Sequence, residues 1–331
     1  MSPQKQIQVL NLEVDYEDVS YFRILVDNSS FKYITIDFGV YCPSDMVWDR
    51  ALIPLLPQFP EGDWNEGHIG RHPERGTPHF TRYARVALGT ISNLWHPTRI
   101  DWIDLRRGER LMSNVYTATL LKGRKKNRDQ QQREQRGQNK KPTASIRSGS
   151  QSRSQSRSPE TSSKNDSFII KYARFPWEIH YYASETAIYK FLEGKGIAPR
   201  FLGHLTEGSN NCNNGGRVIG FALERIEHAR HAGPHDLEAC QEALSKLHRL
   251  GILHGDVNRH NFLIRQPDTG GGDVGSTGAA VTGMAGRKIV TIIDFEFASK
   301  CTDKLAFTEE MDRLKVELHE TDGRGARSIE H

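Results

Sequence analysis

The stretch His254-Gly255-Asp256-Val257-Asn258-Arg259-His260-Asn261 says more about the fold than any other part of the sequence. Downstream of it, Ile289-Val290-Thr291-Ile292-Ile293 is a short apolar run rich in β-branched residues, which predicts a strand that ends on Asp294. Asp256 can orient a hydroxyl group, while the amide of Asn261 and the carboxylate of Asp294 can hold Mg²⁺. In this order, the two stretches predict a site that handles phosphate groups.

A lysine and a glutamate that could complete such a site lie upstream. Residues 168–172, Phe-Ile-Ile-Lys-Tyr, read as a strand that carries Lys171. A helix is predicted over residues 178–193, and Glu185 lies on its apolar face at helical spacing. Glu185 is therefore expected to pair with Lys171. Glu178, nearer the start of the helix, is the alternative partner.

About residues 96–300 resemble the protein-kinase-like superfamily, and the motifs at 254–261 and Asp294 carry most of the resemblance. The runs 175–179 and 196–203, Phe-Pro-Trp-Glu-Ile and Gly-Ile-Ala-Pro-Arg-Phe-Leu-Gly, are similar to a fungal kinase-like family. Members of that family are sometimes labelled α-galactosidase A, a name that these motifs do not support. The resemblance implies a bilobal kinase fold with ATP and Mg²⁺ in the cleft between the lobes.

The resemblance also implies a role for each candidate residue. Asp256 would be the catalytic base, and Lys171, steadied by Glu185, would neutralise the α- and β-phosphates. Asn261 and Asp294 would be the metal ligands. The implied cofactor-binding residues are Lys171, Asn114, Asn261, and Glu224 and Ile226 in the hinge beneath the adenine.

The sequence departs from regulated protein kinases in several places. No G-x-G-x-x-G motif lies upstream, so the phosphate-covering loop is expected over residues 108–114. Asn258 stands where Ser/Thr protein kinases carry lysine, which is similar to lipopolysaccharide-sugar kinases. Glu296 replaces the glycine that usually follows the metal-binding motif, and no A-P-E sequence follows. The short sequence beyond Asp294 is similar to RIO and KEOPS-associated small kinases and predicts a minimal C-terminal lobe.

The sequence thus predicts an α+β, bilobal kinase-like protein with a truncated C-lobe. Its function would be ATP-dependent transfer of the γ-phosphate to a hydroxyl acceptor, with protein Ser/Thr as the leading class. A small-molecule or sugar kinase is favoured instead by Asn258 and the missing A-P-E. An ATP-binding pseudokinase or scaffold is favoured by the missing glycine loop. Residues 1–95 would form a β-rich accessory region, 96–226 the N-lobe and 227–331 the C-lobe.

Positive charge is concentrated in one segment. Residues 122–158 contain twelve Lys/Arg and two acidic residues, although the formal net charge of the whole chain is only +4. The insertion 123–166 has almost no aliphatic and no aromatic residues, so we expect it to be disordered. Its basic run 122–128 could be a nuclear-localisation or nucleic-acid patch, and 148–158 could be phosphorylated by SR-type or proline-directed kinases. A solvated spacer is the alternative, and nucleic-acid binding stays open.

Other features concern the N-terminal region and the cellular compartment. Alternating polar and apolar residues at 10–17 and 34–40 predict half-buried strands. A second insertion, 266–287, contains seven glycines and is expected to be a flexible loop. The four cysteines show no C-x-x-C spacing, and no signal peptide or run of about 18 apolar residues is visible. We therefore expect a cytoplasmic protein with no membrane partner, and the nucleus is the alternative compartment.

Overall fold

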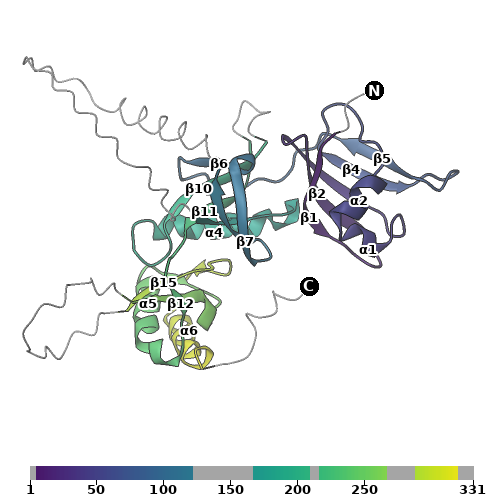
Figure 1. Ribbon diagram of the computed structural model, residues 1–331. Helices are drawn as coiled ribbons and strands as arrows, with labels where there is room; N and C mark the ends of the chain where they lie inside the picture. The colour runs from purple at the N-terminus through teal and green to yellow at the C-terminus, as the bar shows by residue number, and fades with distance from the viewer. Residues whose placement is uncertain (1–4, 122–166, 209–215, 267–287, 320–331) are drawn as a thin grey trace, which may run out of the picture.

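The computed structural model describes residues 5–121, 167–208, 216–266 and 288–319, which form a mixed α+β structure (Figure 1). In these ranges the strands assemble into four sheets accompanied by five α-helices. The α+β class predicted from the sequence is thereby confirmed. The predicted insertion 123–166 lies outside the described residues, as does the glycine-rich loop except for its first residue. Among the described residues, no helix combines the length and the hydropathy needed to cross a membrane.

The first sheet is built from N-terminal residues in the strand order β1-β2-β3-β4-β5. Its strands are β1 (Ile7–Glu13), β2 (Ser20–Val26), β3 (Ser30–Ile36), β4 (Glu66–Arg71) and β5 (Pro78–Ala84). Because β3 and β4 are parallel, the chain must cross over between them, and the short helices α1 (Pro43–Met46) and α2 (Asp49–Leu55) lie in that connection. One face of the sheet forms a core with these helices. Its members include Phe22, Ile24, Ile34, Ile36, Met46, Leu52 and Ile69.

The opposite face of this sheet packs on the rest of the protein. Leu10, Leu25 and Phe31 belong to the main hydrophobic core, whose other buried members all come from Ile91 onward. Strand β2 is therefore covered on both sides, and all of its residues except Tyr21 are buried. Two-sided burial removes the polar–apolar alternation that marks a half-exposed strand, which explains why the sequence pattern did not predict β2.

The second sheet has the order β6-β10-β11-β9-β8-β7. Its strands are β6 (Arg99–Asp101), β7 (Leu105–Met112), β8 (Val115–Leu120), β9 (Phe168–Tyr172), β10 (Phe201–Glu207) and β11 (Arg217–Glu224). Helix α4 (Ile179–Leu192) packs against β9 and β11. Strands β8 and β9 are antiparallel neighbours with Ala118 opposite Phe168, so residues 122–166 connect adjacent strand ends.

Strand β7 corrects the bounds of the loop that was predicted over residues 108–114. The strand runs through this stretch, and the two-residue turn Ser113-Asn114 joins it to β8. Gly108 lies at an irregularity in the pairing of the two strands, where a Cβ atom would clash with Thr117 Oγ1. The glycine therefore permits a close contact within the hairpin and does not form part of a loop.

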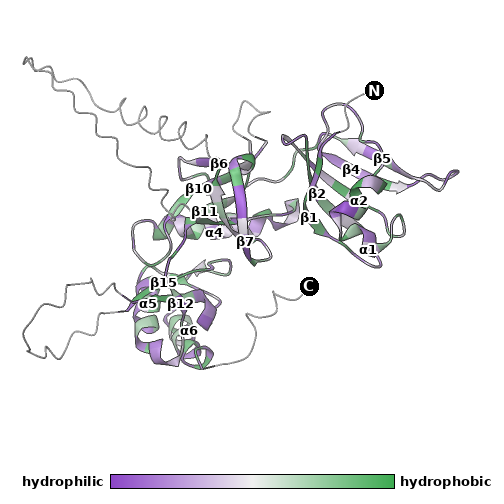
Figure 2. Ribbon diagram, in the orientation of Figure 1, coloured by the Kyte–Doolittle hydropathy of each residue, from purple (hydrophilic) through white to green (hydrophobic). Residues whose placement is uncertain are grey.

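The C-terminal part contains short strands and two helices. They are β12 (Arg230–His231), α5 (Leu237–Arg249), β13 (Ile252–Leu253), β14 (Phe262–Arg265), β15 (Ile289–Ile292), β16 (Ser299–Lys300) and α6 (Lys304–Glu317). Helix α6 begins directly after Asp303, because the Asp303 side chain accepts a hydrogen bond from Leu305 N at 2.8 Å and so caps the first turn. Figure 2 shows hydrophobic and hydrophilic residues alternating along α5 and α6, as expected for helices packed on one side.

Candidate functional site

Three charged side chains from distant parts of the sequence meet beside the second sheet. Lys171 Nζ on β9 lies 2.7 Å from Glu185 Oε2 on α4 and 2.8 Å from Asp294 Oδ1, just after β15. The side chains of Lys171 and Glu185 are buried, and that of Asp294 is 25% exposed. The structure thus brings together the lysine, the helical glutamate and the second acid that the sequence singled out.

Local structure determines which glutamate reaches Lys171. Glu185 lies on the buried side of α4, and its Oε1 also accepts a hydrogen bond from Phe295 N at 3.2 Å. Glu178 lies at the N-terminal end of the helix and pairs with Arg174 at 2.6 Å instead. Of the two glutamates considered from the sequence, Glu185 is therefore the partner of Lys171.

Asp294 has an unusual backbone conformation. Its φ of 65° falls in the left-handed region, which residues with a side chain seldom adopt. Two hydrogen bonds restrain Asp294. Lys171 donates to its side chain, and the N–H of the next residue, Phe295, donates to Glu185. Backbone strain of this kind costs about 1–3 kcal/mol and concentrates at functional sites. Asp294 is therefore a functional candidate on its geometry as well as on its sequence motif.

The charges of the cluster are coupled. Burial alone would lower the pKa of Lys171, but Glu185 and Asp294 together raise this pKa well above its ordinary value. Burial raises the pKa of Glu185 to about 7, although Lys171 opposes the increase. Burial would also raise the pKa of Asp294, but Lys171 outweighs it and holds this pKa below its usual value. The lysine therefore stays charged, Asp294 stays ionised, and Glu185 exchanges its proton most readily near neutral pH.

The segment 254–261 forms a polar loop around Asp256. Asn258 Nδ2 and Asn261 Nδ2 donate to Asp256 Oδ2 at 3.0 and 3.1 Å, and Asn261 Nδ2 also donates to the Asp256 carbonyl oxygen at 2.8 Å. Asn261 lies at the end of a 3₁₀ turn, Arg259–Asn261, directly before β14. Both amides therefore reach the same carboxylate oxygen of Asp256, which fixes its orientation and leaves Oδ1 for another partner.

His254 and Gly255 shape the start of this loop. The His254 ring is buried, and its Nε2 atom lies 3.0 Å from the Ile293 carbonyl oxygen. Burial lowers the pKa of His254, so a neutral ring links the loop to the strand before Asp294. Gly255 has a φ of 82°, and a Cβ atom there would clash with the Phe297 carbonyl oxygen. Only glycine allows the two segments to approach this closely.

Sequence reasoning missed one residue that supports the loop. Glu310 on α6 is buried and accepts hydrogen bonds from Gly255 N at 2.7 Å and His254 N at 3.1 Å. It also contacts His248 Nε2 on α5 at 2.7 Å. Its sequence signal was an acid in line with the apolar residue Leu314, one helical turn further on.

The remaining predicted residues lie at the ends of strands in the second sheet. Asn114 is in the hairpin turn next to Lys171, and its carbonyl oxygen accepts from Tyr172 N at 3.3 Å. Glu224 ends β11, with its side chain exposed and 3.7 Å from Arg200, and Ile226 follows it, partly buried. One cavity of about 340 Å³ is lined by Glu224 and the C-terminal end of α4. Its lining does not include Lys171, Asp256 or Asp294, so it is separate from the charged cluster.

The donor set fits Mg²⁺ bound together with phosphate. With the Asn261 NH₂ group occupied by Asp256, its Oδ1 is the atom left to act as a ligand, and Asp294 adds carboxylate oxygens. Mg²⁺ prefers oxygen ligands and is commonly held by one or two carboxylates plus substrate phosphates. No group of three or more His, Cys, Asp or Glu residues suited to a metal occurs in the described part of the chain. Two side-chain ligands suit a metal that arrives with a nucleotide better than a metal held by protein alone.

Comparison with known proteins adds no assignment. The sequence matches no protein-family model and no curated protein at a significant level.

Proposed function

We propose that the chain is an ATP-dependent phosphotransferase of the protein-kinase-like superfamily that transfers the γ-phosphate to a hydroxyl acceptor. The observation that carries the proposal is the convergence of Lys171, Glu185 and Asp294 from three separate elements. This is the arrangement of lysine, helical glutamate and metal-binding aspartate that phosphoryl transfer in kinases requires. The oriented carboxylate of Asp256 and its neighbour Asn261 supply the remaining groups.

A bilobal arrangement follows from this proposal. The second sheet with α4, in residues 96–226, would be the N-lobe, and residues 227–331 would be a truncated C-lobe. The order of β7 to β11 and the position of α4 between β9 and β10 support this division. The nucleotide would lie between the lobes, with Glu224 and Ile226 at the hinge and Asn114 over the phosphates.

Each side chain of the site has a physical role in this proposal. Mg·ATP, when bound, would supply the phosphoryl group and neutralise part of its charge. Lys171 would place a permanent positive charge against the α- and β-phosphates, with Glu185 holding it in position. Asn261 and Asp294 would hold the metal through their oxygens.

Asp256 would act on the acceptor. Asn258 and Asn261 fix its Oδ2, so Oδ1 is the oxygen available to accept a proton from a hydroxyl group. A base in hydrogen-bond reach of the reacting hydroxyl contributes about 10²–10⁴-fold to the rate. Protein Ser/Thr hydroxyls are the leading acceptor class. Asn258, which contacts Asp256, stands where Ser/Thr protein kinases carry a lysine beside the base. Its presence instead favours a small-molecule or sugar acceptor.

The hairpin Ser113-Asn114 supports a second candidate function. A turn of two residues offers few backbone amides to phosphates, in contrast to a glycine-rich loop. The chain would then be a pseudokinase or scaffold that binds ATP without transferring phosphate. Phosphate transfer itself separates the two candidates.

The decisive experiment measures transfer from γ-labelled ATP with Mg²⁺ to pooled protein, peptide and metabolite extracts. Asp256→Asn should lower turnover by about 10²–10⁴-fold and leave the KM for ATP nearly unchanged. Asp312→Asn, which changes an exposed acid on α6, is the matched control. Equal turnover in wild type and Asp256→Asn would overturn the role of Asp256. Binding of Mg·ATP without any transfer by the wild type would favour the pseudokinase.

A further inference from the structure

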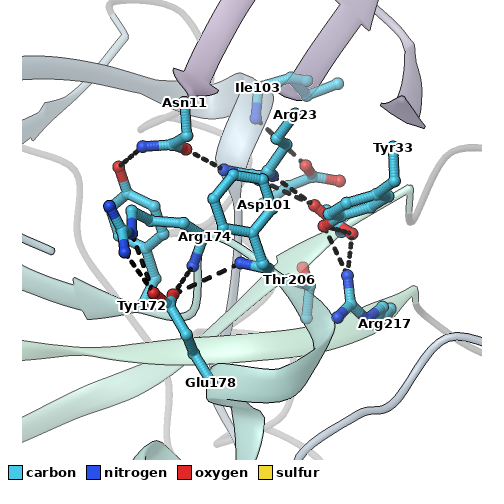
Figure 3. A network of polar contacts seen from close by, with 12 residues as sticks. Asn11, Arg23, Tyr33, Asp101, Ile103, Tyr172, Arg174, Glu178, Thr206 and Arg217 are labelled. Carbon is cyan, nitrogen blue, oxygen red and sulfur yellow. Dashed lines mark hydrogen bonds and ion pairs between the residues drawn. The ribbon is translucent and has the colours of Figure 1, made fainter. Parts of the chain in front are cut away.

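The N-terminal sheet meets the second sheet through buried charges (Figure 3). Arg23 on β2 is fully buried, and its Nη2 lies 2.8 Å from Glu207 Oε2 on β10. Glu207 Oε1 also contacts Arg217 Nη1 at 2.6 Å and accepts from the Tyr33 hydroxyl at 2.8 Å. A surface-exposed accessory domain would not need such a network. Here the first and second sheets share one interior.

The network specifies one arrangement of the two sheets. The Arg23 guanidinium lies 4.3 Å from the Trp102 ring centroid, so it is held between an aromatic face and the Glu207 carboxylate. Burial would raise the pKa of Glu207, but Arg23 and Arg217 outweigh it and hold this pKa below the ordinary value. A buried charge that loses its partner is strongly destabilising, so sliding of one sheet on the other is disfavoured.

From this fixed position, strand β1 contacts the end of β9 and the connection from β9 to α4, residues 173–178. Asn11 Nδ2 donates to the Tyr172 hydroxyl at 3.3 Å. Glu13 Oε2 lies 3.3 Å from Arg174 Nη2. The two contacts reach the last residue of β9 and the connection that follows it, directly after Lys171.

Strand β2 contacts the same connection through an aromatic side chain. The Tyr21 ring meets the Trp177 ring edge-on at 4.7 Å and the Phe175 ring at 6.2 Å between centroids. Within the connection, Glu178 accepts from Arg174 N at 2.6 Å and pairs with the Arg174 guanidinium (Figure 3). The connection is therefore short and internally bonded, so a contact with one of its residues restrains the whole segment.

This connection joins the two halves of one ion pair. Lys171 precedes it on β9, and Glu185 follows it on α4. We propose that the N-terminal sheet is a positioning element that holds α4 against β9 and so keeps the Lys171–Glu185 pair closed. The proposal rests on the proposed phosphotransfer function for its purpose, because placement of this helix controls activity in kinases. Its structural content can be tested independently of activity.

The test measures how readily Lys171 is acetylated by N-hydroxysuccinimidyl acetate in the full-length protein, by peptide mass spectrometry. Tyr21→Ala should raise the labelling rate of Lys171 about tenfold, because a loosened α4 exposes the amine. Tyr21→Phe should restore the wild-type rate, since ring contact and not the hydroxyl carries the effect. Tyr83→Ala, at a half-exposed tyrosine on β5 whose ring contacts Trp64 in the N-terminal region, is the matched control. Lys32, buried inside the N-terminal region, reports whether that region stays folded.

Glu13→Gln provides an independent reading, because Glu13 is half exposed and its loss leaves both cores intact. The Lys171 rate should rise about twofold when the Arg174 contact is weakened. Labelling of Lys171 that is unchanged in both Tyr21→Ala and Glu13→Gln would overturn the positioning role. In an active protein, Tyr21→Ala should also raise the KM for ATP and leave the KM for the acceptor unchanged. If the wild type transfers no phosphate, faster Lys171 labelling in Tyr21→Ala than in the wild type would still support the positioning role and would remove only the proposed function.

Discussion

At the scale of single residues, the site depends on one ammonium group shared by two carboxylates. Lys171 contacts Glu185 and Asp294 at hydrogen-bond distance, so the buried cluster carries one more acid than base. Asp294 stays ionised beside the lysine, whereas burial raises the pKa of Glu185 to about 7. Mg²⁺ and pH should therefore act on different members of the cluster.

Replacing Asp294 by alanine should abolish the stabilisation of the protein by Mg²⁺ with ATP. The side chain supplies the carboxylate ligand, and Asn261 alone is a weak neutral ligand. The measurement is a thermal-shift titration with ATP, with and without Mg²⁺. Asp312→Ala, at an exposed acid of α6, should behave like the wild type. An equal Mg²⁺-dependent shift in Asp294→Ala and the wild type would contradict the metal assignment.

Glu185 should make stability depend on pH. Because its folded-state pKa lies above the ordinary value, the folded state binds this proton more tightly than the unfolded state. Its stabilising contribution is complete below the ordinary value of 4.5 and is lost as the pH rises through about 7. Glutamine resembles the protonated acid at every pH. The free energy of unfolding of Glu185→Gln should therefore increase relative to the wild type as the pH rises.

Chemical denaturation at about pH 5 and about pH 8 measures this difference. Glu227→Gln, at a partly exposed acid paired with Arg225, is the control and should show no such trend. A difference between Glu185→Gln and the wild type that is constant across the pH range would show that Glu185 does not titrate there.

At the scale of elements, helix α6 supports the loop that carries Asp256. Glu310 accepts from two consecutive backbone amides, those of the buried His254 and of Gly255. Burial would raise the pKa of Glu310, but His248 and the two amides outweigh it and hold this pKa below its usual value. The helix therefore presents an ionised acceptor to the start of the loop.

Replacing Glu310 by alanine should destabilise the protein by about 2–3 kcal/mol, because His254 N and Gly255 N lose their acceptor. Turnover should fall as well, since the loop that orients Asp256 begins there. Denaturant unfolding and turnover with γ-labelled ATP measure the two effects. Glu309→Ala changes the exposed neighbour on the same helix and should alter neither by more than about 0.5 kcal/mol. A loss no larger than in this control would show that water replaces the carboxylate.

The elements also show how far the sequence alone could predict the fold and the candidate site. Strand β9 and helix α4 were predicted almost to the residue, because each carries a clear apolar pattern with one special residue. Strand β2 was missed because burial on both faces removes the alternation. Glu310 was missed because its partners are backbone amides of a distant loop, and such acceptors leave no residue pattern in the sequence. Long-range contacts of this kind become visible only in the assembled structure.

At the scale of the whole molecule, three parts share one continuous interior. The N-terminal sheet lies beside the second sheet, and the C-terminal part lies below the second sheet in the view of Figure 1. The main core contains buried residues from all three, such as Leu25, Tyr172 and Leu314. A substitution at the interface of the first two sheets should therefore alter the geometry of the charged cluster. Arg23 itself does not contact Lys171, Glu185 or Asp294.

The basic insertion should be dispensable for this interior. Strands β8 and β9 pair directly, so the chain ends at 121 and 167 can be joined by a short turn. Replacing residues 124–164 with a short Gly-Ser turn should leave the melting temperature unchanged or slightly higher. Shortening the connection recovers about 2 kcal/mol of loop-closure entropy at most.

Phosphate transfer should persist in this variant unless the basic run recruits the acceptor. In that case the affinity for the acceptor should fall, and the remaining binding should lose most of its dependence on salt, because exposed charges are screened over about 10 Å at 0.1 M ionic strength. Calorimetric melting and acceptor titrations at two salt concentrations separate these outcomes. A melting temperature lowered by more than about 5 °C would mean that the insertion packs against the fold, since this corresponds to roughly 2 kcal/mol or more for a chain of this size. The charge and composition of 122–158 would then have to be explained by a folded surface and not by a solvated connection.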